Sequence, residues 1–373
     1  MLLLLLPAVA AGQPRGTPDI WLVTYGPGEV YWQRFGHNAI WVRDAELGLD
    51  HTFNFGFFDF EQEDFFVRFL QGRMLYFSAA QRASDEFSQY INENRSIRAQ
   101  RLALPPDRAL QLADFLVEQV QPQNRDYLYD YYLDNCSTRV RDALDLALGG
   151  ALRESFETQP APLHFRDHTR RLTQSAFWLY LGLEIGLGSP VDRPISRWDE
   201  FFIPAVLAEG ISGLTANGAP LVVEDVLIHE TGSPLPPDRP TAVWLRYLLA
   251  SVGLLAAVAA VVRWAGAGWG RTLARSWLAV TGLVGAALLF FWFGTDHAVA
   301  AWNLNLLVFT PFGLLVLGGR KGAPPAAVLT VICALLVPIA SLAPPHQYTA
   351  DVLAAFLPLN LAAAWVVWSR RGA

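Results

Sequence analysis

The chain holds two cysteines, and Cys136 stands where a nucleophile could form. Asn135 directly before it makes a good helix N-cap. Apolar residues at helical spacing follow: Val140, Ala143, Leu144, Ala147 and Leu148. The pattern predicts a helix that begins at Cys136, where backbone N–H groups and the helix dipole favour a thiolate. The structural alternative is a small buried residue at a helix start, with Asn135 acting only as its cap.

A cysteine nucleophile needs a general base, and His37 is the best placed candidate. It opens a predicted strand directly after Gly36. A base on a rigid strand that faces a helix-borne thiol is the papain-type arrangement. The remaining histidines of this half are predicted to be ordinary surface or core residues: His51, His164, His168 and His229.

The residues around these two candidates indicate an α+β domain over 13–232. Short aromatic and β-branched runs at 20–25, 37–43 and 51–55 predict strands. The runs 85–94 and 107–120 predict helices, with apolar residues at helical spacing in the second, and 153–200 is expected to be helical with loops. Strands that come first and helices that come after them are typical of α+β domains.

A transmembrane domain is predicted over 243–371, after a Pro-rich linker at 233–242. Five apolar stretches there approach the ~20 residues needed to cross a bilayer. They cover 243–262, 274–293, 300–318, 324–342 and 351–368. The loops after the first and third stretches and the C-terminal tail carry the basic residues: Arg263, Arg271, Arg275, Arg320, Lys321, Arg370 and Arg371. The positive-inside rule then places the N-terminal domain outside and the C-terminus in the cytoplasm.

The N-terminal half carries the acidic charge and begins with an export-type segment. Residues 1–12 form a leucine-rich run that ends in small residues, which resembles a signal peptide although no basic region precedes it. All but two of the 34 acidic residues precede Thr241. So acidic a domain has no electrostatic basis for binding nucleic acid or anionic headgroups.

Several motifs, taken together and in this order, resemble the Lnb family of lipoprotein N-acyltransferases. In the outer domain they are FGHNAIWV at 35–42, DHTFNFGFFDF at 50–60 and YLYDYYLDNCSTR at 127–139. In the membrane half they are TDH at 295–297, WNLNLL at 302–307 and the following TPF. The resemblance covers most of the chain.

This resemblance implies a permuted papain-like (NlpC/P60-like) outer domain, in which the histidine strand precedes the cysteine helix, followed by an all-α bundle of about five transmembrane helices. Enzymes related to lecithin–retinol acyltransferase share that order and move acyl chains from phospholipid through a cysteine thioester. The implied reaction transfers an acyl chain from phospholipid to the α-amine of the lipidated N-terminal cysteine of a lipoprotein. His37 would deprotonate Cys136, and the backbone N–H of Cys136 would supply part of the oxyanion hole.

The third catalytic residue is either Asn54 or His51. Strand alternation places these two side chains on opposite faces, so Asn54 would orient His37 if its own face meets the cysteine helix, and His51 would do so otherwise. The family motif slightly favours Asn54. Candidate substrate-binding residues are Asn135 beside the thiol and the outward polar residues Asp296, His297, Asn303 and Asn305.

The predicted enzyme is a thiol-dependent, ping-pong acyltransferase of the bacterial inner membrane. No cofactor is expected. No metal is expected either, because His164 and His168 have helical ligand spacing but no third ligand is obvious. Its partners are a phospholipid donor and a diacylglyceryl lipoprotein acceptor, with no nucleic acid. The alternatives are a cell-wall amidase or endopeptidase on the same fold, and a non-catalytic membrane sensor or scaffold.

Overall fold

The computed structural model describes residues 16–46, 48–216, 218–344 and 346–369. The predicted signal-like segment at 1–12 lies outside these residues. The chain divides into two compact units. The sheet unit contains the described residues up to Phe58, together with Tyr76–Glu157 and Phe201–Pro234. The membrane unit contains Asp59–Leu75, Thr158–Glu200 and the described residues from Leu235 onward.

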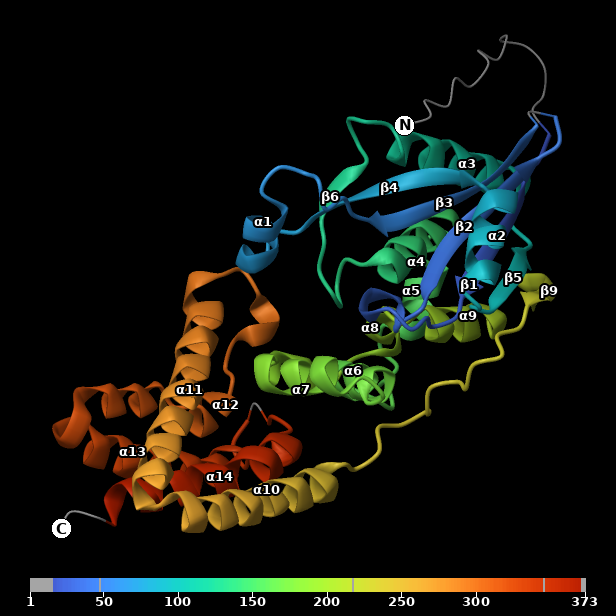
Figure 1. The fold of residues 1–373 in the computed structure, drawn as a ribbon. Helices are drawn as coiled ribbons and strands as arrows, with labels where there is room; N and C mark the ends of the chain where they lie inside the picture. Colours follow the sequence, from blue (N-terminus) through green and yellow to red (C-terminus); the bar gives the residue numbers. More distant parts are fainter. Residues whose placement is uncertain (1–15, 47, 217, 345, 370–373) are drawn as a thin grey trace. The chain divides into compact units, whose positions relative to one another are not determined.

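The sheet unit is built on a seven-stranded sheet in the order β6-β4-β3-β2-β1-β5-β9 (Figure 1). Its strands are β1 (Asp19–Tyr25), β2 (His37–Asp44), β3 (Leu49–Phe57), β4 (Leu75–Arg82), β5 (Ile97–Leu102), β6 (Asp126–Leu128) and β9 (Val222–His229). The three predicted strands are confirmed as β1, β2 and β3. In the sheet order from β4 through β3, β2, β1 and β5 to β9, each strand pairs antiparallel with its neighbour. The first residues of β2 and β4 therefore lie at the same end of the sheet as the last residues of β1 and β3.

Helices cover both faces of this sheet. On one face, Phe87 and Tyr90 of α2 (Ala83–Asn92) pack on a buried cluster that includes Val23 and Ala39. On the other face, α4 (Cys136–Ala147) packs against β2 and β3. The remaining helices of this unit are α3 (Pro106–Gln119), α5 (Ala151–Phe156) and α9 (Pro204–Ser212). A short hairpin of β7 (Thr215–Ala216) and β8 (Ala219–Pro220) precedes β9.

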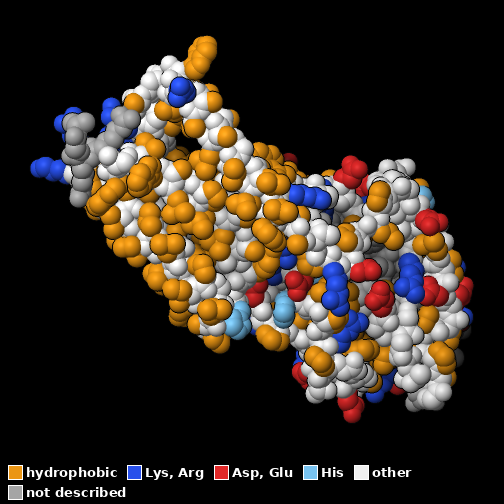
Figure 2. All heavy atoms as spheres, turned by 90° about the horizontal axis from the view of Figure 1, so that it is seen from below, with side chains coloured by type: hydrophobic (Ala, Val, Ile, Leu, Met, Phe, Trp, Pro, Cys, Tyr) orange, Lys and Arg blue, Asp and Glu red, His pale blue; other side chains and the backbone are white. Residues whose placement is uncertain are grey.

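The membrane unit combines long apolar helices with short segments drawn from the N-terminal half. The short helices are α1 (Phe65–Gln71), α6 (Phe165–Thr173), α7 (Phe177–Gly186) and α8 (Arg197–Glu200). The later helices are α10 (Trp244–Ala265), α11 (Ala267–Gly294), α12 (Asn305–Val308), α13 (Gly319–Ala340) and α14 (Ala350–Trp368). Figure 2 shows that hydrophobic side chains cover most of the visible face of these later helices.

Within the described residues, four helical stretches are long and apolar enough to cross a membrane, rather than the five predicted. One of the four, Asn305–Ala340, is not a single straight helix. It consists of α12, the 3₁₀ segment η4 (Pro311–Gly318) and α13. Within the predicted span 300–318, the structure therefore has α12 and η4 in place of one continuous α-helix. Pro311 lacks an N–H, and Thr310 before it is extended with ψ 131°, so the helix stops there.

The broken segment nevertheless runs alongside α11 and contributes a residue to each of two apolar clusters. One cluster joins Val308 to Leu288 of α11, and the other joins Val316 to Leu278. A 3₁₀ helix rises about 2.0 Å per residue against about 1.5 Å for an α-helix, so eight 3₁₀ residues cover the length of about eleven α-helical ones. The interrupted segment therefore extends further along α11 than an α-helix of the same number of residues would.

Small residues allow this close approach between α11 and the broken segment. A Cβ placed on Gly285 would lie 1.5 Å from the carbonyl oxygen of Phe309, and one on Gly313 would lie 2.3 Å from that of Leu278. Glycine is therefore required at both positions. Asn360 of α14 donates to the carbonyl of Val308 at 2.8 Å, which pairs a backbone group that the helix break leaves over.

Candidate active site

Cys136 occupies the first position of α4, and local hydrogen bonds fix the start of this helix. The Asn135 side-chain oxygen accepts from the backbone N–H groups of Ser137 at 3.0 Å and Thr138 at 2.9 Å. The Thr138 hydroxyl accepts from the backbone N–H of Asn135 at 2.8 Å, which completes a capping box. The thiol is thus attached to a helix start whose geometry is set by the side chains of Asn135 and Thr138 on either side of it.

The sheet brings this thiol to the beginning of β2. The Ser137 hydroxyl donates to Asn38 Oδ1 at 2.8 Å, and the backbone N–H of Asn38 bonds the Cys136 sulfur. Gly56 of β3 has φ +92°, and a Cβ placed on it would lie 3.3 Å from the Cβ of Cys136. Any other residue at Gly56 would be strained and would crowd the thiol.

His37, the residue directly before Asn38, is held by a chain of hydrogen bonds. Its Nε2 lies 2.8 Å from Asn54 Oδ1, and Asn54 Nδ2 donates to Glu86 Oε2 at 2.7 Å. An amide oxygen only accepts, so Nε2 carries the proton and the lone pair is on Nδ1. This tautomer leaves Nδ1 able to take up a proton.

Of the two candidates for the third residue, Asn54 contacts His37, whereas His51 lies further along β3. His51 pairs across the strands with Val42 and Arg82, while Asn54 pairs with Ala39. Asn54 was expected to orient His37 only if its face of β3 met the cysteine helix. In the structure Asn54 and His37 instead share the face covered by α2, whereas α4 packs on the other face. His37 is the first residue of β2, so both faces meet at this end of the sheet.

Desolvation by the surrounding protein favours the uncharged form of both the thiol and the imidazole, although Cys136 and His37 are each only partly buried by surface area. It raises the pKa of the Cys136 thiol to about 11, although backbone N–H groups of Asn38 and Ser137 oppose this. It lowers the pKa of His37 to about 4, and the hydrogen bond to Asn54 only partly offsets it. The thiolate predicted from the helix start is therefore outweighed by desolvation. Near neutral pH the pair is a thiol and a neutral imidazole.

The residues that support His37 include three that sequence reasoning did not identify. Glu86 is 2% exposed and binds both Asn54 and the Thr52 hydroxyl. Tyr25 stacks on His37 with ring centroids 5.9 Å apart, and Tyr90 stacks on Tyr25 at 3.7 Å. The one available signal was the position of Glu86 inside a predicted amphipathic helix, where a carboxylate on the buried face needs a partner.

Arg95 adds a buried positive charge next to this group. Its guanidinium lies 4.5 Å from the Tyr90 ring centroid, and its side chain is 4% exposed. Nε donates to the carbonyl of Gly26 at 2.8 Å. The same charge opposes the burial that raises the pKa of Cys136, and it helps to lower that of His37. Arg95 therefore favours an anion at the sulfur and a neutral imidazole.

The predicted substrate-binding asparagines use their side-chain amides on the protein's own backbone. Asn135 donates to the carbonyls of Tyr131 and Phe202 as well as capping α4. Asn303 and Asn305 donate to carbonyls in the last turn of α7, at 2.8–3.1 Å. These carbonyls have no partner within the helix, so the two asparagines act as its C-terminal cap.

Asp296 and His297 are likewise engaged within the membrane unit. Asp296 Oδ2 lies 2.6 Å from Arg73 Nε, and both side chains are more than half exposed. His297 Nε2 donates to the carbonyl of Phe69 at 2.9 Å. Both residues hold the segment that contains α1, and neither is brought to Cys136 by these contacts.

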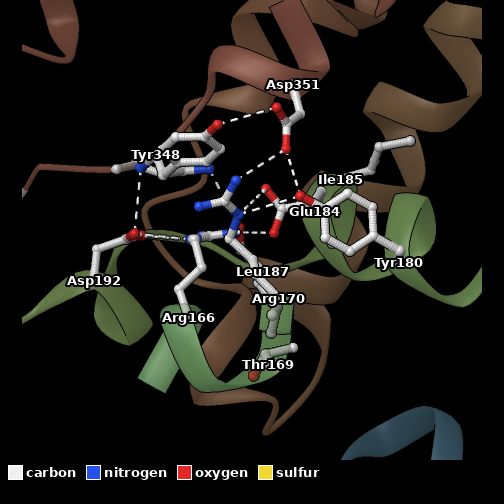
Figure 3. A network of polar contacts seen from close by, with 12 residues as sticks. Arg166, Thr169, Arg170, Tyr180, Glu184, Ile185, Leu187, Asp192, Tyr348 and Asp351 are labelled. Carbon is white, nitrogen blue, oxygen red and sulfur yellow. Dashed lines mark hydrogen bonds and ion pairs between the residues drawn. The ribbon is translucent and has the colours of Figure 1, made fainter. Parts of the chain in front are cut away.

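A second polar cluster, buried in the membrane unit, joins α6 and α7 to the start of α14 (Figure 3). Arg166 binds Asp192 at 2.8 Å, and Arg170 binds Asp351 at 3.2 Å. Glu184 lies between the two arginines at 3.6 and 3.8 Å, and burial raises its pKa to about 7.

Two tyrosines complete this cluster. The Tyr180 hydroxyl donates to Asp351, and the Tyr348 hydroxyl does so at 3.0 Å. The Tyr348 ring also lies 3.8 Å from the Arg170 guanidinium carbon. The cluster thus fixes α6 and α7 to a membrane helix through several charged contacts that are closed to solvent.

Among the residues that the structure describes, no three His, Cys, Asp or Glu side chains are arranged to hold a metal ion. A cavity beside α3 and α4 is lined by Phe55, Phe115, Gln119, Leu133, Asp134, Arg139, Asp142 and Ala143. None of these eight is a predicted catalytic residue.

Comparison with known proteins identifies both halves of the chain. Residues 17–174 match the family model of the Lnb N-terminal periplasmic domain, and residues 240–371 match that of the Lnb transmembrane domain. No curated protein and no solved structure matches the chain. The first match identifies the N-terminal domain as periplasmic, and the second agrees with the apolar helices of the membrane unit. The chain is a membrane protein of the Lnb family.

Proposed function

We propose that this protein is a lipoprotein N-acyltransferase that uses Cys136 as its nucleophile. The acyl donor is a phospholipid, and the acceptor is the α-amine of the lipidated N-terminal cysteine of a lipoprotein. Membership of the Lnb family supports an enzyme of lipoprotein processing at the membrane. The observation that carries the proposal is the hydrogen bond between His37 and Asn54, because it leaves Nδ1 of His37 able to act as a base while the adjacent Asn38 bonds the Cys136 sulfur.

In the first half-reaction His37 Nδ1 takes the thiol proton while the sulfur of Cys136 attacks the ester carbonyl of the phospholipid. Because both groups are neutral at rest, proton transfer accompanies the attack rather than preceding it. The tetrahedral oxyanion is stabilised by backbone N–H groups at the start of α4 and by the charge of Arg95. The carbon–oxygen bond then breaks, the lysophospholipid oxygen takes the proton from His37, and a thioester remains.

In the second half-reaction the lipoprotein amine attacks the thioester carbonyl and gives its proton to His37. The carbon–sulfur bond breaks, an amide forms, and the proton returns to the sulfur of Cys136. Asn54 and Glu86 act as positioning residues, because they hold the imidazole in the tautomer that both half-reactions need. The scheme is ping-pong and requires no cofactor.

We also propose a location in the bacterial inner membrane with the C-terminus in the cytoplasm. The arginine-rich loops support this orientation, provided that the segment from α12 to η4 crosses the membrane. Its contribution to the two apolar clusters of α11 supports such a crossing.

Mass spectrometry of lipoprotein N-termini tests the function directly. Cells that produce the protein should carry N-acylated lipoproteins, whereas cells that produce Cys136→Ser should carry a free α-amine. Cys333→Ser is the matched control, since that cysteine lies in α13, and it should behave as wild type.

The purified full-length protein in phospholipid micelles should also accumulate a hydroxylamine-sensitive acyl group on Cys136 when the acceptor is left out. Unchanged N-acylation by Cys136→Ser, or cleavage of peptidoglycan peptides without acyl transfer, would contradict the proposal and favour the amidase or scaffold alternatives.

A further inference from the structure

The segment Asp59–Leu75 interrupts the sheet between β3 and β4 yet belongs to the membrane unit. Three contacts attach it to the loop that follows α11. The backbone N–H of Asp296 donates to the carbonyl of Gln71 at 2.7 Å, and its carboxylate binds Arg73. His297 donates to the carbonyl of Phe69. Helix α1 is therefore fixed at the end of a membrane-length helix, as Figure 1 also shows.

The turn after α1 depends on glycine for this attachment. Gly72 has φ +77°, and a Cβ placed on it would lie 2.8 Å from the backbone nitrogen of His297. Both the backbone angle and the close approach exclude a larger residue. The sequence thus provides a specific site of contact between α1 and this loop.

Among the described residues of the membrane unit, helix α1 carries large apolar side chains that remain exposed. Phe66 is 74% exposed, and Val67, Phe69 and Leu70 are each about half exposed. No residue of the helix is buried. Water contact with so many apolar side chains on two helical turns is unfavourable, and such a patch is typical of an interaction surface.

This apolar surface is continuous with that of the membrane helix next to it. The Phe69 ring lies 6.5 Å from the ring of His297, which lies 5.7 Å from that of Phe291 in α11. Neighbouring residues of α11 that are exposed in the isolated chain are Phe290 and Phe293. Because α11 is a candidate membrane span, the same lipid that covers its end is next to α1.

The charges around α1 indicate how it meets that lipid. Two arginines belong to this segment, Arg68 in α1 and Arg73 bound to Asp296. Four exposed carboxylates outnumber them and precede the helix: Asp59, Glu61, Glu63 and Asp64. They disfavour a surface of anionic headgroups, so apolar insertion must supply the attraction. Charge alone would not bring this segment to a membrane.

We propose that α1 is an interfacial anchor that inserts Phe66, Phe69 and Leu70 into the outer leaflet of the bilayer. The partner is a phospholipid surface, and the contact does not depend on acyl transfer. Strand β3, which carries Gly56 beside Cys136, continues along the chain directly into this segment.

Photocrosslinking to lipid tests the anchor. The full-length Cys136→Ser protein would carry benzoylphenylalanine in place of Phe66, in nanodiscs of zwitterionic phosphatidylcholine. Phe293 of α11 is the positive control, with the same 74% exposure, and Leu146 of α4, 61% exposed, is the matched control in the sheet unit. Intact-mass spectrometry would measure the fraction of protein that gains one lipid.

We expect lipid adducts at position 66 to approach the level at position 293 and to exceed that at position 146 by at least about tenfold, because burial of one phenylalanine shifts such an equilibrium by more than that. Position 69 should give the same result if substitution at position 66 disturbs folding. Adduct levels at positions 66 and 69 equal to that at position 146, or protein–protein adducts in their place, would overturn the anchor. Because the protein is Cys136→Ser, neither outcome depends on the proposed acyl transfer.

Discussion

The protonation state of Cys136 gives the sharpest test of the site, because it separates a neutral thiol from a thiolate–imidazolium pair. A pKa of about 11 leaves roughly one thiolate in a thousand molecules at pH 8, against roughly one in ten for a thiol at the reference value of 9.0. The more basic thiolate is the better nucleophile, by roughly eightfold for two pKa units. Alkylation of Cys136 should therefore be about tenfold slower than that of an unperturbed thiol.

The assay is iodoacetamide alkylation followed by mass spectrometry from pH 6 to pH 11, in a Cys333→Ser background so that one thiol reacts. The rate should rise with pH up to about 11 without a step at lower pH. The same protein in denaturant supplies the reference rate. Because His37 is neutral above a pKa of about 4, His37→Ala should leave the alkylation rate at pH 7 nearly unchanged, while it abolishes acyl transfer.

An ion pair would give a different profile. Alkylation would then already be fast at pH 6–7, and it would slow markedly in His37→Ala. That result would refute the conclusion that burial outweighs the helix dipole at Cys136. The matched control His51→Ala should follow the profile of the parent protein under either outcome.

The other predictions concern positioning, stability and topology. Asn54→Ala should lower kcat for acyl transfer by roughly tenfold or more with little change in KM, whereas His51→Ala should leave both near wild type; equal losses in steady-state assays would contradict the choice of Asn54. Burial raises the pKa of Glu184 to about 7, so its stabilisation is present at pH below about 4.5 and is lost as pH rises through 7. Thermal unfolding in detergent should show this fall, up to ~3 kcal/mol, in wild type but not in Glu184→Gln; parallel profiles would show that Glu184 does not titrate there. An impermeant thiol reagent should label a cysteine at Ala298 but not one at Gly322 in cells with a permeabilised outer membrane, and equal labelling would mean that the segment between them does not cross.

The sequence predicted three interior strands of the sheet but not β5, which lies between β1 and β9. β1, β2 and β3 are central in the sheet, so their β-branched and aromatic residues form clear runs. β9 lies at an edge with most of its residues exposed, and β4 begins within a long aromatic stretch. Neither has a distinctive alternation, so neither could be predicted.

The two reactive residues of the candidate site could be predicted from the sequence, but the residues that hold His37 in place could not. A lone cysteine at a helix start and a histidine at a strand start are local patterns, and both are found at the same end of the sheet. The contact between Asn54 and Glu86 joins residues 32 positions apart, and no periodicity encodes it. Likewise, composition made 300–318 look like an ordinary span, whereas Pro311 and the carbonyl-binding Asn360 decide its broken form.

The buried cluster around Arg170 has a consequence for how the chain is synthesised. Its two arginines are made and exported long before Asp351, which belongs to the last membrane helix. Until α14 inserts, Arg170 lacks its main carboxylate partner, and α6 and α7 cannot bury their charges at low cost. Assembly of this region therefore waits for the final helix, so a nascent chain that ends early keeps a charged, unsatisfied surface that proteases and chaperones can recognise.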